Sequence, residues 1–303
     1  MLFRSMDRRT FLHGALAAPM AAAWATPALA QAWPTRTITI IVAFPPGGQA
    51  DLAARPVALA LERILGKSVI VQNVSGAGGM IGNAQAARAD DGHTFLMALS
   101  SMTFLPEAER LFDRKPSYEL DQFTPVARVL ADPATLPVMA SSPWKTVADL
   151  VEDAKKRPEA IAFSSSGNYG AGHVPMEMFQ QAAGIKLLHV PYRGGGPALA
   201  AFLGNQTPVT VQAPGPVWPH VQEGKVRLLA TWADKRTAEM PNVPTMIELG
   251  YKDFVVDTFH CMQAPAGTPA DVVDRLANAC IAALKEPTFR DKLRDAEIGR
   301  AHV

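Results

Sequence analysis

Two glycine-rich loops, far apart in the chain, carry the residue types best suited to bind a small anion. Residues 44–51 read FPPGGQAD and follow the β-like run of residues 38–43, whereas residues 164–173 read SSSGNYGAGH and follow the apolar residues 161–163. A helix-like pattern comes after each loop. The first turn of a helix has unpaired backbone N–H groups and the positive end of the helix dipole. Each loop therefore predicts an anion site.

We expect the two loops to clamp one small carboxylate between two lobes. Glycine lets the backbone approach a ligand closely, and hydroxyl, amide and bridging-water contacts complete such a site. The candidate ligand-binding residues are Ala43, Phe44, Pro46, Gly47, Gly48, Asp51, Ser100, Ser165, Ser166, Gly167, Asn168, Tyr169, His173, Tyr192 and Gln212. Two roles stay open for Asp51, which either accepts a backbone N–H at its helix start or faces the ligand. Tyr192 fits a cleft wall and a half-buried hinge equally well.

Two alternative functions, dinucleotide binding and hydrolysis, are disfavoured by the motifs of the sequence. Residues 76–82 read GAGGMIG, but a dinucleotide-binding G-x-G-x-x-G that starts at Gly76 would place Ile81 at its third glycine. A turn that packs a helix against a strand is the better interpretation. His173 near Ser166 suggests a base and a nucleophile, yet the chain has no G-x-S-x-G motif and no identifiable partner to orient the histidine. We expect no catalytic residue.

The two cysteines, Cys261 and Cys280, have no neighbouring ligand spacing for a metal, so we predict neither a metal site nor a cofactor. An exported pair could form a disulfide. However, Cys280 falls in an apolar helical stripe and Cys261 in a β-like run, a placement that favours two free, buried thiols.

The N-terminus predicts export. Residues 7–12 read DRRTFL, as in a twin-arginine signal, and an apolar stretch at 15–25 and the triplet ALA at 28–30 follow. Eleven apolar residues are fewer than the roughly 20 that span a bilayer. We expect cleavage near Ala30 and a periplasmic protein. Without residues 1–30 the chain has 26 basic and 27 acidic residues, which gives no reason to expect nucleic acid or an anionic membrane as partner.

Both ends of the chain read like the translation of a sequencing adapter. The two segments are residues 2–5, LFRS, and residues 298–303, IGRAHV. We therefore expect Met6 to be the natural start, residues 1–5 to be artefactual and the natural chain to continue beyond about Glu297.

Strand-like and helix-like runs alternate along the chain, which predicts an α/β fold with mixed, mostly parallel sheets. The predicted strands are 37–43, 68–72, 94–99, 124–130, 137–139, 161–164, 187–190, 209–212, 226–231 and 255–264. The predicted helices are 52–65, 80–88, 147–156, 175–183, 197–203, 217–223, 269–285 and 288–295. Proline-rich turns suggest that residues 31–134 and 256–303 form one lobe and residues 135–255 the other, joined by a two-segment hinge.

Short motifs over nearly the whole exported chain resemble the tripartite tricarboxylate transporter solute-binding family, also called the Bug family. They are WPTRTI at 33–38, FPPGGQAD at 44–51, NVSGAGGMIG at 73–82, DGHT at 91–94, SSGN at 165–168, HVPYRG at 189–194, VPT at 243–245 and APAGTP at 264–269. The resemblance implies the type II periplasmic binding protein fold, a small carboxylate ligand and a membrane permease as partner. It also implies that loops 43–51 and 164–173 hold the ligand carboxylate through amides, hydroxyls and water.

The sequence departs from the family in regions that set ligand specificity. Tyr169 and His173 occupy positions that are often small or hydroxylic, and residues 211–215 lack the acidic residue that is frequent there. An amino-acid ligand, whose ammonium needs a counter-charge, is therefore disfavoured. We predict a monomeric periplasmic receptor that delivers its carboxylate to a permease. The rival functions are a ligand-sensing module for a membrane signalling receptor and, with less support, a periplasmic hydrolase.

Overall fold

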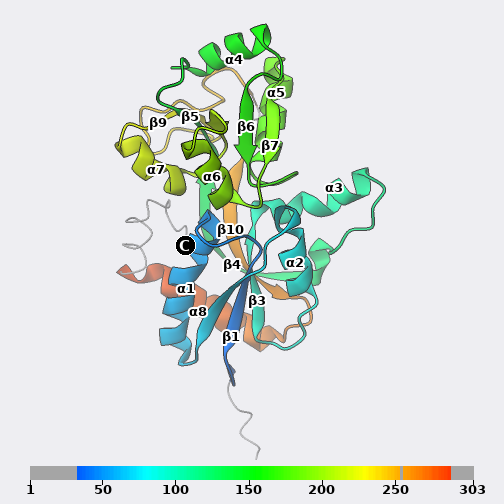
Figure 1. Cartoon of the computed structure of the whole chain (residues 1–303). Coiled ribbons are helices and arrows are strands. Elements are labelled where there is room, and N and C mark those ends of the chain that lie inside the picture. The colour runs from blue at the N-terminus through cyan, green and yellow to red at the C-terminus, as the bar shows by residue number, and fades with distance from the viewer. Residues whose placement is uncertain (1–32, 253–254, 288–303) are drawn as a thin grey trace, which may run out of the picture. The chain divides into compact units, whose positions relative to one another are not determined.

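The computed structural model describes residues 33–252 and 255–287, which form two five-stranded sheets with helices packed on them (Figure 1). The predicted two-lobe α/β fold is confirmed. The predicted export signal, the final predicted helix at 288–295 and the two adapter-like ends lie outside the described residues.

The first lobe is built on the sheet with strand order β2-β1-β3-β10-β4. Strands β1, β2 and β3 pair in parallel, whereas β10 pairs antiparallel with both β3 and β4. Its strands are β1 (Ile38–Val42), β2 (Val69–Asn73), β3 (Thr94–Leu99), β4 (Phe123–Pro133) and β10 (Asp257–Pro265). Its main helices are α1 (Gln49–Leu65), α2 (Met80–Ala87), α3 (Leu105–Leu111) and α8 (Ala270–Lys285).

The second lobe repeats this plan with the order β7-β6-β8-β5-β9. Strands β7, β6 and β8 are parallel, and β5 pairs antiparallel with β8 and β9. Its strands are β5 (Thr135–Met139), β6 (Ala162–Ser165), β7 (Leu188–Pro191), β8 (Val209–Thr210) and β9 (Val226–Thr231). Its helices are α4 (Val147–Lys156), α5 (His173–Ala183), α6 (Gly195–Leu203) and α7 (Pro214–Gln222).

The fourth strand of each sheet is the one that arrives from the other lobe. Strand β5 follows directly on β4 of the first sheet, and β10 is the first strand after β9 of the second. These crossing strands run antiparallel to their neighbours. Among the described residues, four strand pairings are parallel and four antiparallel, whereas the sequence predicts mostly parallel ones. The exact lobe boundaries, 134/135 and 255/256, remain predictions.

Apolar side chains explain why these segments pack. Strand β1 is buried along nearly its whole length, as expected for a parallel strand with both faces covered. Helix α1 turns Ala53, Ala54, Val57 and Leu61 inward at helical spacing. The largest core of the second lobe includes Phe163, Phe179 and Trp232, which are fully buried. Each lobe thus has its own apolar interior, and the loops above the strand ends are left to bind ligands.

The glycine-rich turn at residues 76–82 packs helix α2 onto the first sheet. A Cβ atom added to Gly82 would lie 2.6 Å from the carbonyl oxygen of Val74 and 2.7 Å from the Cα atom of Ala43. Both are backbone atoms and cannot swing aside. The structural interpretation of this turn therefore fits the contacts.

Replacing Gly82 by alanine is expected to destabilise the protein. The added methyl group overlaps two backbones, and we expect the free energy of unfolding to fall by about 1–3 kcal/mol in a urea titration. The matched control is Gly267→Ala, since a Cβ atom there meets nothing within 4 Å. That control should change stability by less than about 0.5 kcal/mol. Equal effects of both changes would contradict the packing role.

Both cysteines are free thiols in the structure, and Cys280 is buried as predicted whereas Cys261 is half-buried. In the part of the chain that the structure describes, no helix combines the length and apolar character needed to cross a membrane.

A histidine lies inside the first lobe with no compensation for its polarity. His260 on β10 is fully buried, and neither ring nitrogen has a hydrogen-bond partner among the described residues. Burial lowers the pKa of His260 from 6.5 to about 3. The unfolded chain therefore binds a proton that the folded chain rejects, and stability must fall as the pH decreases below about 6.5.

We predict that His260→Phe reduces this acid sensitivity. Between pH 6.5 and pH 5 the histidine should cost the wild-type protein on the order of 2 kcal/mol, a cost that continues to grow down to about pH 3. The buried phenylalanine carries no proton, so its free energy of unfolding should decline less over the same interval. Urea titrations at several pH values measure both. Identical slopes for the two proteins would rule the effect out.

Candidate functional site

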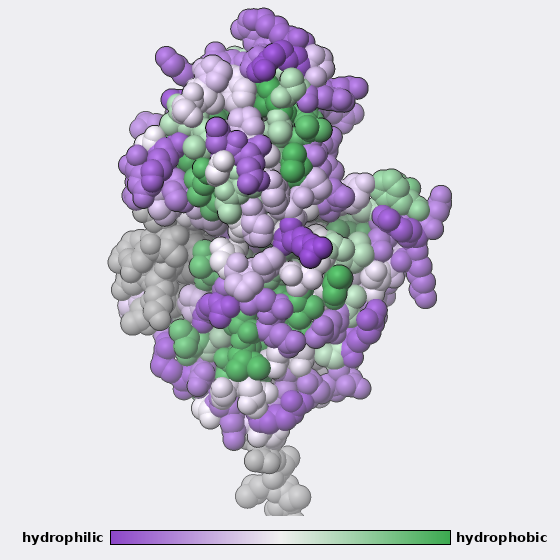
Figure 2. All heavy atoms as spheres, viewed as in Figure 1, coloured by the Kyte–Doolittle hydropathy of each residue, from purple (hydrophilic) through white to green (hydrophobic). Residues whose placement is uncertain are grey.

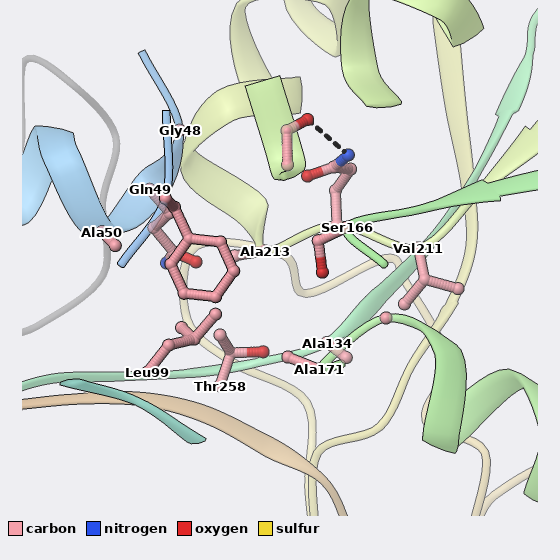
Figure 3. A pocket seen from close by; sticks show the side chains of 14 residues that line it. Gly48, Gln49, Ala50, Leu99, Ala134, Ser166, Ala171, Val211, Ala213 and Thr258 are labelled. Carbon is pink, nitrogen blue, oxygen red and sulfur yellow. Dashed lines mark hydrogen bonds between the residues drawn. The ribbon is translucent and has the colours of Figure 1, made fainter. Parts of the chain in front are cut away.

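A cavity with about 490 Å³ of empty space, its open mouth included, lies where elements of both sheets meet. Its wall consists of 14 residues that come from the ends of strands and the starts of helices (Figure 3). They are Phe44, Gly48, Gln49, Ala50, Leu99, Ala134, Ser166, Ala171, Gly172, Gly195, Val211, Gln212, Ala213 and Thr258. None of the 14 carries a charge, so any charge on a ligand must be met by dipoles and neutral hydrogen bonds.

The first loop brings the start of helix α1 to the cavity. The helix begins at Gln49, three residues before the predicted start at Leu52, and Gly48 precedes it in an extended conformation. The backbone N–H groups of Gly48, Gln49 and Ala50 have no hydrogen-bond partner among the described residues. Figure 3 places these three residues together on one side of the cavity. They provide three available donors at the positive end of a 17-residue helix.

Asp51 stabilises this loop through hydrogen bonds and does not line the cavity. Its carboxylate accepts the N–H of Gly47 at 3.1 Å, the Nδ2 of Asn73 at 2.9 Å and two bonds from Arg55 at 2.8 and 2.9 Å. Burial acts to raise the pKa of Asp51, but the bonds from Arg55, Asn73 and Gly47 outweigh it and hold the pKa below its usual value. Of the two roles left open for Asp51, the bond from Gly47 supports the first.

The second loop brings the start of helix α5 to the same cavity. Strand β6 ends at Ser165 and α5 begins at His173. The N–H groups of Ala171 and Gly172, just before the helix, find no acceptor within the described part of the chain. The hydroxyl of Ser166, which lines the wall, is equally available. Ser166 and Ala171 lie across the cavity from Gly48 in Figure 3.

A third helix start, which the sequence analysis missed, completes the wall. Helix α6 begins at Gly195, whose N–H has no partner among the residues described, and α7 begins beside Ala213. The Nε2 of Gln212 donates to the carbonyl oxygen of Gly195 at 3.1 Å (Figure 3, dashed line). The run of three glycines at 194–196, which follows a strand as in the other two loops, is the sequence pattern that could have revealed this third loop.

Glycines meet where the lobes touch beside the cavity. A Cβ atom on Gly48 would lie 3.5 Å from the backbone nitrogen of Gly196, and one on Gly167 would lie 3.2 Å from the Cα atom of Gly78. A Cβ atom on Gly194 would come within 2.6 Å of Pro45. Gly167 and Gly194 therefore favour residues without a side chain, whereas the approach of Gly48 to Gly196 is an ordinary van der Waals contact.

The predicted ligand-binding residues fall into two groups. Four of them line the cavity, namely Phe44, Gly48, Ser166 and Gln212. The others lie outside its wall: Ala43, Pro46, Gly47, Asp51, Ser100, Ser165, Gly167, Asn168, Tyr169, His173 and Tyr192. Ser165 is fully buried and bonded to His189, at 2.6 Å between Oγ and Nε2. The assignment of the whole set as ligand contacts remains a prediction.

The comparison with known proteins identifies the family. The model of the tripartite tricarboxylate transporter family receptor matches residues 53–302. The chain belongs to this family. It is 36% identical over 250 residues to protein BugT of Bordetella pertussis, an alignment that covers 82% of this chain and 76% of BugT.

Two solved structures are similar to this chain over most of its length. The periplasmic binding protein BugD has a TM-score of 0.81 and 34% identity, with 87% of this chain and 88% of BugD covered. MatC from Rhodopseudomonas palustris, solved with bound malate, has a TM-score of 0.81 and 29% identity, with 87% of this chain and 89% of MatC covered.

Asp51→Ala is expected to loosen the first loop and to destabilise the protein. The change removes the acceptor of four hydrogen bonds, two of them from a guanidinium, so we expect a loss of about 2 kcal/mol in the free energy of unfolding. Glu152→Ala is the control, because within the described residues Glu152 forms an ion pair with Lys156 alone, on an exposed helix face. It should cost less than about 0.5 kcal/mol. Chemical unfolding of both variants decides whether the buried carboxylate matters.

Proposed function

We propose that the protein is a periplasmic receptor that binds a small carboxylate in this cavity and delivers it to a tripartite tricarboxylate-type permease. One observation carries the proposal. Six backbone N–H groups without partners in the described chain, those of Gly48, Gln49, Ala50, Ala171, Gly172 and Gly195, belong to the wall of one neutral cavity. A carboxylate supplies acceptors for such donors, and the ends of three helices favour its charge.

Ligand capture follows from the arrangement of these donors. Lobe 1 contributes the start of α1, and lobe 2 contributes the starts of α5 and α6. A ligand that bonds to both sets is held most tightly when the lobes are together, so binding favours closure about the two crossing segments. The malate bound to the similar protein MatC supports a small carboxylate as the ligand. The permease then recognises the closed form, and no covalent bond changes.

The geometry gives less support to a hydrolase. The serine hydrogen-bonded to a histidine is Ser165 of the second loop, whose partner is His189 on β7, and Ser165 is fully buried and outside the cavity wall. A nucleophile must reach the substrate. Ser166, which does line the cavity, has no hydrogen bond to a histidine among the described residues. The receptor class of the family points the same way.

A ligand screen tests the proposal. Thermal unfolding is measured with citrate, malate, adipate and benzoate, and a ligand present at 100 times its Kd should stabilise the folded protein by about 2.7 kcal/mol. Ser166→Ala should weaken binding of the best acid about tenfold, since it removes one hydrogen-bond donor. Gly48→Val should nearly abolish binding, because a Cβ atom at this cavity-lining position already lies 3.5 Å from the backbone nitrogen of Gly196 and the two further methyl groups would crowd the cavity.

The control is Arg193→Ala. Arg193 follows Tyr192 in the third loop but is exposed and lies outside the cavity wall, so its removal should leave the affinity unchanged. Absence of stabilisation by all four acids would refute the proposal, as would unchanged affinity in both the Ser166 and Gly48 variants.

A further inference from the structure

Two histidine side chains are stacked beneath the second loop. The ring centroids of His173, the first residue of α5, and His189 on β7 are 4.0 Å apart with an interplanar angle of 15°. The ring of Phe163 stacks on His189 at 4.8 Å, and the ring of Tyr169 meets His173 edge-on at 5.5 Å. Neither histidine lines the cavity.

Each histidine supports one part of the second loop: His189 supports Gly167 through Ser165, and His173 supports Tyr169. The Nε2 atom of His189 is 2.6 Å from Ser165 Oγ, and that oxygen also accepts the N–H of Gly167 at 3.2 Å. The Nδ1 atom of His173 accepts the N–H of Tyr169 at 3.0 Å. Tyr169 has a φ of 56°, which is uncommon for a residue with a side chain and persists only where neighbours hold it.

Gly167 and Tyr169 each contact the first lobe. Gly167 approaches Gly78 so closely that a Cβ atom would be 3.2 Å from its Cα atom. The ring of Tyr169 lies 5.5 Å from that of Phe112, which follows helix α3 and is 52% exposed. Apolar side chains reach the surface over α3 in Figure 2. The histidine pair therefore supports two of the contacts through which this loop meets the other lobe.

The bonds to the pair require an uncharged His173. Its Nδ1 can accept the N–H of Tyr169 only while it carries no proton. Among the described residues the charged group that faces the pair is Glu177 on α5, whose Oε1 is 3.4 Å from His173 Nε2. Burial lowers the pKa of His173 although Glu177 opposes it, and burial together with His173 lowers the pKa of His189 to about 4. The pair is thus neutral at neutral pH.

We propose that His173 and His189 are positioning residues that hold the second loop against the first lobe, and that a proton taken up by the pair releases the loop and weakens ligand binding. The inference rests on the proposed function. Protonation at His173 Nδ1 removes the acceptor of Tyr169, and a second charge 4.0 Å away would repel the first. Since the loop-bound pair resists protonation, acid favours the released loop.

Amide exchange in the full-length ¹⁵N-labelled protein tests the loop without any ligand. In the wild-type protein the Tyr169 amide, corrected for intrinsic exchange, should lose protection at least tenfold between pH 7.5 and pH 5. In the double variant His173→Asn/His189→Gln the amide groups replace Nδ1 and Nε2 without titrating, so protection should persist at pH 5. His173→Ala should lack it at both pH values.

His260→Phe is the matched control, because it removes a buried histidine that supports neither Gly167 nor Tyr169. It should leave the pH response of Tyr169 unchanged. A Tyr169 amide equally protected at both pH values in the wild-type protein would overturn the inference, as would a double variant that still responds to acid.

Affinity gives the second readout. Citrate, malate, adipate and benzoate are titrated at pH 7.5 and pH 5, and the best binder should lose at least tenfold more affinity in the wild-type protein than in the double variant. Equal losses would overturn the inference and leave the receptor function intact. Failure of every acid to bind at pH 7.5 would instead refute the receptor function. The amide-exchange experiment would still test whether the histidine pair holds the second loop.

Discussion

Backbone N–H groups that helices cannot bond internally determine how this site is built. The starts of α1 and α6 and the segment before α5 bring such groups to one cavity, and no charged side chain of the described residues lines its wall. An unpaired buried donor is costly, so the wall requires an acceptor, from solvent or from a solute.

The two lobes support their donors by different chemistry. In the first lobe an ionised carboxylate, that of Asp51, gathers a guanidinium, an amide and the loop backbone. In the second lobe the supporting groups are the neutral rings of His173 and His189 with the hydroxyl of Ser165. A charged support tolerates a wide range of pH, whereas a neutral imidazole does not. The two halves of one binding site therefore differ in their sensitivity to acid.

Sequence reasoning recovered the elements of the fold better than the site. Strand β3, strand β9 and helix α4 have the predicted bounds because their periodicity is regular. Helices α1, α5, α6 and α7 each begin two or three residues earlier than predicted. Glycine and proline at these helix starts made the segments look like loops. Helix propensities describe helix interiors, whereas the N–H groups of the first turn form no hydrogen bonds within the helix, so these residues are tolerated there.

The same effect hid part of the cavity. Gln49 and Ala50 are first-turn residues, and Gly195 opens α6, so all three were assigned to the wrong side of a helix boundary or overlooked. Helix α3 was missed entirely because its seven residues are too short for a clear period. The histidine stack joins residues 16 positions apart on a helix and a strand, and no local pattern reports such a contact.

The position of the crossing strands has a consequence for biosynthesis. In the sheet order, β4 is joined to β3 only through β10, and β9 is joined to β8 only through β5. Residues 257–265 are therefore inserted between two strands that the ribosome has completed more than 120 residues earlier. The amino-terminal half of the chain cannot close its sheet until almost the entire polypeptide has emerged. Such long-range pairing slows folding. The sheet of the first lobe cannot be completed before β10, in the last third of the chain, has been synthesised.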